Sequence, residues 1–258
     1  MSNEPLSPTS TEPPLEPHST PHRGGLAAVL ESKDPQRRSF ADYRQFIQHH
    51  YDGLPGALTA VTGVVTGHEK LAGRLIRPGA FDVSGCKHIL DAACGNGRYT
   101  HFLLRRADPD AQITGFDYSH NMLLRARKRL HSDRPTHVAA DLTRLPYASA
   151  VFDAIVCGWV LEHLPDPRPG LRELARVLRP GGKLLLLATE DTLTGAMCSR
   201  MWHCRTYNRQ ELRKVCEECG LDWERELWFS KLHAWLHLGG IIVELQRAIL
   251  GADRAPAA

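Results

Sequence analysis

The residues best suited to chemistry lie between His88 and Arg98, in the run His-Ile-Leu-Asp-Ala-Ala-Cys-Gly-Asn-Gly-Arg. An apolar stretch typical of a buried strand leads into a turn with Gly95 and Gly97, and a helical pattern follows. Glycines at such a turn let a ligand approach the backbone closely, because no side chain blocks it. In an open α/β sheet, a ligand is expected at this carboxyl end of a strand.

Acidic residues follow three of the predicted strands, and their chemistry narrows the ligand class. Asp91 can hold a cationic amino group through charge-assisted hydrogen bonds. Asp117, about 20 residues beyond Gly97, can accept hydrogen bonds from both hydroxyls of a ribose. Asp141 can bind an adenine amino group while Leu142 packs on the ring. Together the three acids predict a site for a phosphate-free nucleoside that carries an amino acid.

A nicotinamide dinucleotide is the rival ligand for the same turn. A dinucleotide site needs a third glycine to pack the helix against the strand, and Thr100 stands at that position. Asp91 is also a poor neighbour for a pyrophosphate. A dehydrogenase is therefore disfavoured.

Five segments match, in order, the motifs of one enzyme family: residues 91–97, 115–119, 140–142, 152–166 and 177–183. They resemble the class I S-adenosylmethionine-dependent methyltransferases, most closely the ubiquinone/menaquinone-methyltransferase-like group, over roughly residues 51–245. The resemblance implies transfer of a methyl group from S-adenosylmethionine, which leaves S-adenosylhomocysteine. The Met and aromatic side chains of segment 191–207 suit a small, apolar or aromatic acceptor that is quinone-, phenol- or lipid-like.

The resemblance also assigns the cofactor site residue by residue. Ala93 replaces a glycine of the usual loop, a small-for-small change, and Cys157 is expected to offer its backbone carbonyl to the cofactor's amino group. Tyr51 is similar to an N-terminal residue that often closes over the cofactor. The implied cofactor-binding residues are Tyr51, Asp91, Ala93, Gly95, Asn96, Gly97, Asp117, Tyr118, Asp141, Leu142 and Cys157.

The acceptor side is expected later in the chain. Because the sulfonium is already an activated methyl donor, holding a nucleophile in line can supply much of the rate. His163 is the candidate general base, against the alternative that it only orders the loop before Pro165. Segment 191–207 lies where this family builds a substrate lid, although packing between two helices explains its side chains equally well. The candidate substrate-binding residues are Met197, Met201, Trp202, His203, Tyr207 and His233, the last in a predicted loop.

Short β-type stretches alternate with helical ones, which predicts an α/β fold with a mostly parallel sheet and helices on both faces. The expected strands are 88–92, 112–117, 137–140, 152–157, 183–188, 223–229 and 240–245. The expected helices are 98–107, 121–130, 171–178 and one that begins at Asn208, with a turn at 180–182 ending the third. The family resemblance implies a Rossmann-like seven-stranded sheet whose last strand is antiparallel.

One domain behind a tail is expected from the 258 residues. Residues 1–22 are rich in Pro, Ser, Thr and Glu and almost without large apolar side chains, which predicts a disordered tail, assigned to residues 1–37. Residues 38–258 are assigned to the methyltransferase domain, with a helical cap over 38–80 and the substrate lid over 191–207.

Composition bounds the partners and the compartment. A net charge of +3 without a concentrated basic stripe gives no reason to expect nucleic acid. Seven cysteines, an odd number, favour reduced thiols and a cytoplasmic setting. The pair Cys216 and Cys219 has a zinc-ligand spacing but no matching second pair, so no metal is expected. The apolar stretches are too short to span a membrane, and the oligomeric state stays unknown.

Two further functions stay open on the same evidence. One is an RNA or protein methyltransferase on this fold, although the segment after the fourth strand, residues 157–159, lacks the Asn/Asp-Pro-Pro-aromatic motif of adenine amino-group methylation. The other is a non-catalytic regulatory protein that binds S-adenosylmethionine without consuming it.

Overall fold

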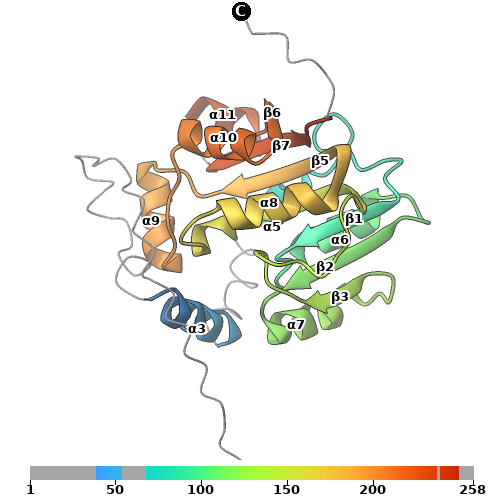
Figure 1. The fold of residues 1–258 in the computed structure, drawn as a ribbon, viewed down its shortest axis with the longest axis horizontal. Coiled ribbons are helices and arrows are strands. Elements are labelled where there is room, and N and C mark those ends of the chain that lie inside the picture. The colour runs from blue at the N-terminus through green and yellow to red at the C-terminus, as the bar shows by residue number, and fades with distance from the viewer. Residues whose placement is uncertain (1–38, 54–67, 237–238, 250–258) are drawn as a thin grey trace, which may run out of the picture.

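A computed structural model describes residues 39–53, 68–236 and 239–249 of the chain (Figure 1). The tail predicted over 1–37 and part of the predicted cap, residues 54–67, lie outside these ranges. The strands are β1 (His88–Ala92), β2 (Gln112–Asp117), β3 (Thr136–Ala139), β4 (Phe152–Gly158), β5 (Leu178–Ala188), β6 (Leu221–Glu226) and β7 (Ile241–Arg247). The helices are α3 (Phe40–Asp52), α5 (His68–Gly73), α6 (Arg98–Arg106), α7 (His120–Leu130), the 3-10 turn η1 (Leu161–His163), α8 (Arg168–Val177), α9 (Leu193–Trp202), α10 (Arg209–Glu218) and α11 (Lys231–Leu236).

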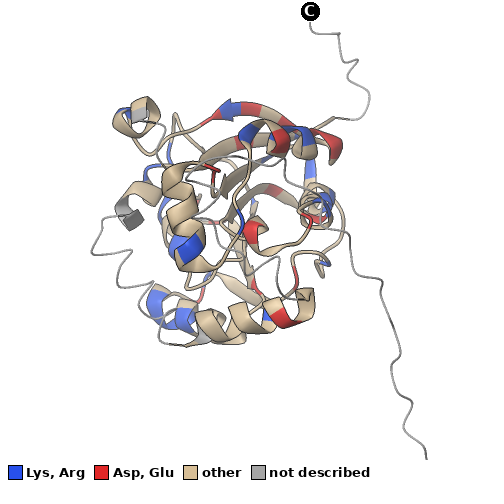
Figure 2. Ribbon diagram, turned by 90° about the vertical axis from the view of Figure 1, so that its left-hand side faces the viewer, with Lys and Arg blue, Asp and Glu red and all other residues tan. Residues whose placement is uncertain are grey.

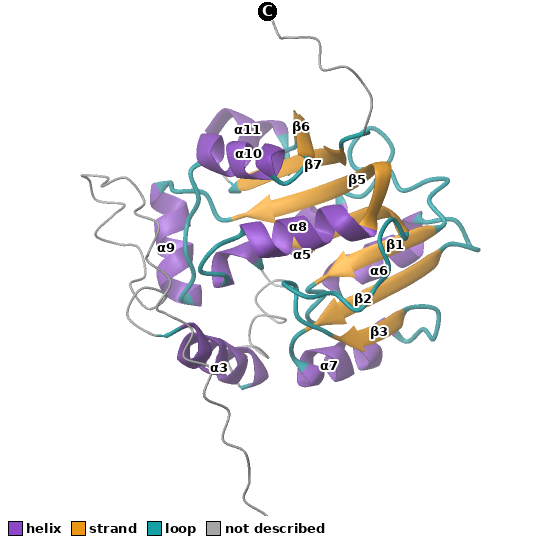
Figure 3. Cartoon of the chain, viewed as in Figure 1, coloured by secondary structure: helices purple, strands orange, loops and turns teal. Residues whose placement is uncertain are grey.

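The strands form one seven-stranded sheet in the order β3-β2-β1-β4-β5-β7-β6. Strands β1 to β5 pair in parallel, whereas β7 runs antiparallel to both β5 and β6. The predicted α/β fold with an antiparallel last strand is confirmed. In Figure 3 the arrowheads of β1, β2 and β5 point to the side of the molecule that holds α3 and α9.

Alternation along the strands explains why helices cover both faces of the sheet. In β5, Leu184 and Leu186 pack with residues of α8 and α10, whereas Leu185 and Leu187 pack with residues of α5 and α6. Successive side chains of a strand point to opposite faces, so a strand buried on both sides is apolar at every position. The run of leucines in β5 follows from this central position.

Local signals set several helix ends. Ser119 caps α7, because its side chain accepts a hydrogen bond from the Met122 amide at 3.1 Å. The side chain of Asn208 accepts from the amides of Gln210 and Glu211 and so begins α10, as its position in the sequence predicts. These caps fix the turns that follow β2 and precede α10.

Three expectations about the elements are wrong. Helix α8 ends at Val177 and β5 begins at Leu178, so the Pro-Gly-Gly turn of 180–182 falls inside β5, beside a register shift against β4. Strand β6 begins and ends earlier than predicted because Leu221 is fully buried at its start. His233 lies in helix α11 rather than in a loop.

Candidate active site

The turn between β1 and α6 bends through three residues with a left-handed backbone. Ala93 and Gly95 both have a φ of 53°, and Gly97 has a φ of 79°. The Cys94 amide donates to the Phe116 carbonyl at 2.8 Å, which holds the turn against β2. Ala93 therefore adopts a conformation that glycine adopts at lower cost, as expected where the usual loop has glycine.

Asp91 lies at the end of β1 with a side chain that is almost wholly buried. Thr100 of α6 donates its hydroxyl to Asp91 Oδ2 at 2.5 Å. Burial raises the pKa of Asp91 to about 7, although the hydrogen bonds from Thr100 act in the opposite direction. A buried carboxyl of this kind suits a cationic amino group, which offsets the cost of ionising it.

Asp117 ends β2 and ties the glycine turn to the start of α7. Its Oδ2 accepts from the Gly95 amide and its Oδ1 from the Ser119 amide, both at 2.8 Å. A carboxylate oxygen has two lone pairs, so each oxygen retains the capacity to accept a ribose hydroxyl as well. Asn96, also in the turn, accepts from Arg129 of α7 at 3.1 Å. The turn is thus held from two sides.

Asp141 follows β3 and faces helix α3. Its Oδ2 lies 3.0 Å from the guanidinium of Arg44, and its Oδ1 accepts from the Thr143 amide at 2.9 Å. The Arg44 guanidinium also lies 4.3 Å from the centre of the half-exposed Tyr118 ring. Leu142 is buried in the core. Residues predicted for ribose and adenine therefore share one edge of the sheet, and α3 approaches them through Arg44.

We use the name strand-end group for Asp91, Asp117, Asp141 and the turn 93–97. Asp91 and Asp117 belong to neighbouring strands, since β1 pairs in parallel with β2. Cys157 of β4 pairs with Ala92 of β1, so its backbone also lies beside the turn. One buried carboxyl, that of Asp91, and two half-buried, hydrogen-bonded ones around a turn of small residues fit a nucleoside that carries an amino group.

A second set of side chains gathers around helix α3, and we call it the ring cluster. It comprises Tyr43, Phe46, His50 and Tyr51 of α3, His163 of η1, Trp202 of α9 and His203. Tyr51 stacks on Trp202 with an interplanar angle of 6° and a centroid distance of 6.4 Å. His203 meets the edge of Phe46 at 5.0 Å. The cluster joins three segments that are far apart in the sequence.

His163 is held through both ring nitrogens. Its Nδ1 lies 2.8 Å from the hydroxyl of Tyr43, and its Nε2 lies 3.3 Å from that of Tyr51. Burial lowers the pKa of His163 to about 4, and the nearby His50 lowers it further. The imidazole is therefore neutral at physiological pH, with a lone pair on one nitrogen.

Glu162 lies beneath the ring cluster and is fully buried. Its Oε1 accepts from the amide of Thr189 at 2.7 Å and from the Thr189 hydroxyl at 2.8 Å. Among the described residues, Oε2 has no hydrogen-bond partner. Burial raises the pKa of Glu162 to about 7 despite the Thr189 hydrogen bonds. This carboxyl ties η1 to the end of β5.

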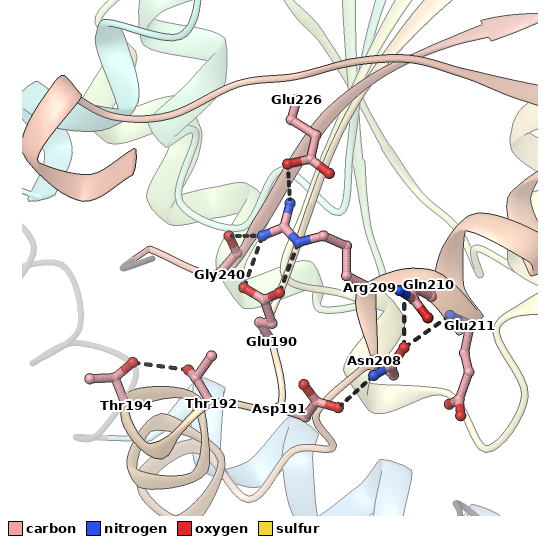
Figure 4. Close-up of polar contacts among 10 residues, drawn as sticks. All are labelled: Glu190, Asp191, Thr192, Thr194, Asn208, Arg209, Gln210, Glu211, Glu226 and Gly240. Carbon is pink, nitrogen blue, oxygen red and sulfur yellow. Dashed lines mark hydrogen bonds and ion pairs between the residues drawn. The ribbon is translucent and has the colours of Figure 1, made fainter. Parts of the chain in front are cut away.

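The predicted lid, 191–207, is closed at its base by polar contacts (Figure 4). The Arg209 guanidinium binds both carboxylate oxygens of Glu190, at 2.8 and 2.9 Å, and lies 2.9 Å from Glu226. The Asp191 amide donates to the Tyr207 carbonyl, and the side chain of Asn208 donates to that of Asp191. These contacts anchor both ends of the segment that contains α9, where it leaves β5 and where it enters α10.

The candidate substrate-binding residues occupy different places. Trp202 and His203 belong to the ring cluster, whereas Met197 and Met201 are exposed on α9. The hydroxyl of Tyr207 donates to the Leu161 carbonyl at 2.7 Å and so supports η1. His233 contacts Ser230 and Phe229, and Figure 1 shows its helix α11 away from α3. The structure therefore does not bring His233 to the ring cluster.

The zinc-like pair of cysteines lies on α10, where Cys216 is buried and the Cys219 amide caps the helix end. Within the described ranges, no three His, Cys, Asp or Glu side chains are placed to hold a metal ion.

No described helix is long and apolar enough to cross a bilayer. Figure 2 shows basic and acidic residues interspersed over the ribbon.

Several residues around the site are not identified by the sequence motifs. Tyr43, Arg44, Thr100 and Thr189 make contacts that depend on the folded chain. Tyr43 had a usable signal, because it lies two helical turns before Tyr51 on the same face of α3. The partners of Asp91 and Glu162 had none, since a lone threonine gives no indication of what its hydroxyl will meet.

Comparison with known proteins gives consistent results. Residues 90–186 match a family described as a methyltransferase domain. The chain is 33% identical over 144 residues to a ubiquinone/menaquinone biosynthesis C-methyltransferase of Desulfotalea psychrophila, covering 55% of this chain and 58% of that protein. It is 37% identical over 114 residues to a demethylmenaquinone methyltransferase of Halalkalibacterium halodurans, covering 43% of this chain and 46% of that protein. The chain thus spans about half the length of these relatives.

Solved structures show the same fold. A putative methyltransferase in complex with the Trm112 activator, from Haloferax volcanii, aligns with a TM-score of 0.61 and 16% identity over 79% of this chain and 98% of that chain. The N-methyltransferase NodS from Bradyrhizobium japonicum, with bound S-adenosylhomocysteine, aligns with a TM-score of 0.54 and 18% identity over 70% of this chain and 86% of that chain. By its motifs, fold and relatives, the chain belongs to the class I S-adenosylmethionine-dependent methyltransferases, in the ubiquinone/menaquinone-methyltransferase-like group.

Proposed function

We propose that this protein transfers a methyl group from S-adenosylmethionine to a small acceptor that is apolar or aromatic. The observation that carries the proposal is the strand-end group, in which buried Asp91 and the doubly hydrogen-bonded Asp117 flank one turn of small residues. Tyr51 of the ring cluster links the two groups, because its backbone carbonyl accepts from Arg125 of α7. A donor side and an acceptor side thus share one end of the sheet.

Each part of the strand-end group has a place in this proposal. Asp91 would bind the amino group of the methionine part, with the backbone carbonyl of Cys157 beside it. Asp117 would accept from the ribose hydroxyls, and Asp141 would accept from the adenine amino group after an exchange of its partner Arg44. Leu142 and Tyr118 would pack against the adenine ring, and Asn96 would support the turn.

The acceptor class rests on the rings. Trp202, Tyr51 and Phe46 offer apolar faces that suit a flat or lipid-like molecule, and the polar tips of Tyr51 and His163 suit a hydroxyl or carbonyl on it. Relatives named as ubiquinone/menaquinone and demethylmenaquinone methyltransferases support an aromatic acceptor. We place the reaction in the cytoplasm, since Cys94 and Cys157 are buried free thiols.

For methyl transfer, the main task of the protein is to position the acceptor relative to the methyl group. The bound cofactor supplies an electrophilic methyl group on a sulfonium. The ring cluster would exclude water and hold the acceptor in line with that methyl, which is where much of the rate arises. Neutral His163 would accept the proton that an acceptor hydroxyl loses.

Thermal unfolding with S-adenosylmethionine, S-adenosylhomocysteine and NAD at matched concentrations tests the cofactor class. A ligand that binds only the folded state raises the melting temperature. We expect stabilisation by the first two and none by NAD, and stabilisation by NAD alone would overturn the proposal.

A second step tests the acceptor and the catalytic reading. Incubation with S-adenosylmethionine carrying an isotopically labelled methyl group, together with quinones, phenols or lipids, should yield a labelled product and S-adenosylhomocysteine. Tight cofactor binding with labelled RNA or protein as the only product would refute the small-molecule acceptor. Binding without turnover on any of these acceptors would indicate a regulatory protein instead.

A further inference from the structure

The hydrogen bonds around His163 determine which ring nitrogen carries its proton. The hydroxyl of Tyr43 donates to the backbone carbonyl of His203 at 2.7 Å. A phenol has one hydroxyl hydrogen, so the Tyr43 oxygen, 2.8 Å from His163 Nδ1, can only accept in that second contact. The proton of neutral His163 is then on Nδ1, and the lone pair is on Nε2.

We propose that Tyr43 is a positioning residue that fixes His163 as the Nδ1–H tautomer and so makes Nε2 the basic atom presented to the acceptor. Tyr43 is buried, and its hydroxyl connects α3, η1 and the residue after α9 in one chain of hydrogen bonds. The tautomer assignment stands on this geometry, and its catalytic meaning rests on the proposed methyl transfer.

The two contacts of His163 differ in length, and the longer one is easier for an acceptor to replace. The bond to Tyr43 is short, at 2.8 Å, whereas Tyr51 lies 3.3 Å from Nε2, near the limit of a useful hydrogen bond. Tyr51 also belongs to the side of the cluster nearer the strand-end group, because its carbonyl accepts from Arg125 of α7, the helix that follows Asp117. An acceptor hydroxyl that enters there can take the place of the Tyr51 hydroxyl at Nε2.

The proton and charge then balance. When an acceptor hydroxyl gives its proton to Nε2, its oxygen forms the bond to the methyl carbon. The carbon–sulfur bond breaks, and its electron pair stays on sulfur. The positive charge that leaves sulfur appears on the imidazolium, whose Nδ1–H still donates to Tyr43. The opposite tautomer would place an N–H against the acceptor hydroxyl and could not take its proton.

Nuclear magnetic resonance of the full chain with 15N-labelled histidine tests the tautomer without any acceptor. Long-range 1H–15N spectra distinguish the two neutral tautomers, and His163→Gln identifies the signals of His163 among the 14 histidines. We expect an Nδ1–H pattern in the wild type, its loss in Tyr43→Phe, and its retention in Tyr51→Phe. An Nε2–H pattern in the wild type, or an unchanged pattern in Tyr43→Phe, would overturn the proposal.

Two controls distinguish a failure of the tautomer proposal from a failure of the proposed methyltransferase function. Circular dichroism should show Tyr43→Phe folded, and S-adenosylhomocysteine should raise its melting temperature as much as that of the wild type, because the hydroxyl that is removed binds His163 and the His203 carbonyl. Failure of the wild type to bind S-adenosylhomocysteine would refute the methyltransferase proposal and leave the tautomer intact. With a methylated acceptor in hand, Tyr43→Phe should lower kcat by about tenfold or more with the KM for the cofactor unchanged, and an unchanged kcat would refute the positioning role.

Discussion

The strand-end group and the ring cluster are built in different ways, although they face one site. The acids of the strand-end group lie at the ends of consecutive strands, and the parallel pairing of β1 with β2 places Asp91 and Asp117 at neighbouring strand ends. The ring cluster takes its members from α3, η1 and the end of α9, which no strand pairing unites. Regular secondary structure positions the first group, whereas individual side-chain contacts position the second.

The sharpest test of the ring cluster is the pH dependence of its buried support, Glu162. Burial raises the pKa of Glu162 from 4.5 to about 7. The folded state therefore holds this proton more tightly than the unfolded chain, and the associated stability is present below about pH 4.5 and is lost as the pH rises through 7. The change is on the order of 3 kcal/mol.

Glu162→Gln cannot ionise, so its free energy of unfolding should exceed that of the wild type by an amount that grows from pH 5 to pH 8 in urea titrations. The lowered pKa of His163 acts in the opposite direction but is common to both proteins. Glu224→Gln, on the exposed part of β6, serves as the matched control. A difference that is constant with pH would show that Glu162 is ionised in the folded protein.

The corresponding test of the strand-end group is the pH dependence of cofactor binding. Burial raises the pKa of Asp91 from 3.8 to about 7, whereas a bound ammonium requires the carboxylate. We expect calorimetric affinity for S-adenosylhomocysteine to fall as the pH drops from 7 to 5, approaching about tenfold per pH unit. Asp91→Asn should bind more weakly at pH 7 and lose this slope. An equal slope in both proteins would place the titrating group elsewhere.

Removing Asp117 tests whether the strand-end group binds the ribose. Asp117→Ala should weaken binding of S-adenosylhomocysteine by roughly 1.5–3 kcal/mol, the cost of charged hydrogen bonds. Asp133→Ala, in the exposed turn after α7, should leave the affinity unchanged. Isothermal titration calorimetry on both variants gives the comparison, and wild-type affinity in Asp117→Ala would contradict the assignment.

The smallest expected effect concerns Ala93, whose φ of 53° is costly for any side chain. Ala93→Gly relieves this strain and should raise the free energy of unfolding by up to about 1 kcal/mol. The greater conformational entropy of glycine in the unfolded chain offsets part of this gain. Ala150, with a φ of 58° far from the turn in sequence, gives a matched Ala150→Gly control for strain alone. A lower melting temperature in Ala93→Gly would show that the methyl group packs in the turn.

The same contrast explains what the sequence could predict. Asp91, Asp117 and Asp141 were predictable as one group because strand ends in a parallel sheet meet at one edge. His163 was predictable as a candidate base, but its partners Tyr43 and Tyr51 depend on how α3 docks. The loop predicted around His233 is a helix, because the six residues of α11 carry too weak a periodicity to distinguish a helix from a loop.

The order of strands in the sheet has a consequence for synthesis of the chain. Strand β7 follows β6 in sequence but lies between β5 and β6, and β6 has no other partner in the sheet. A nascent chain that has emerged from the ribosome only as far as β6 therefore presents β5 as an open edge lined by leucines. Until residues 241–247 are available, the backbone N–H and C=O groups on this side of β5 have no strand partner, so the sheet cannot be completed before the last strand is made.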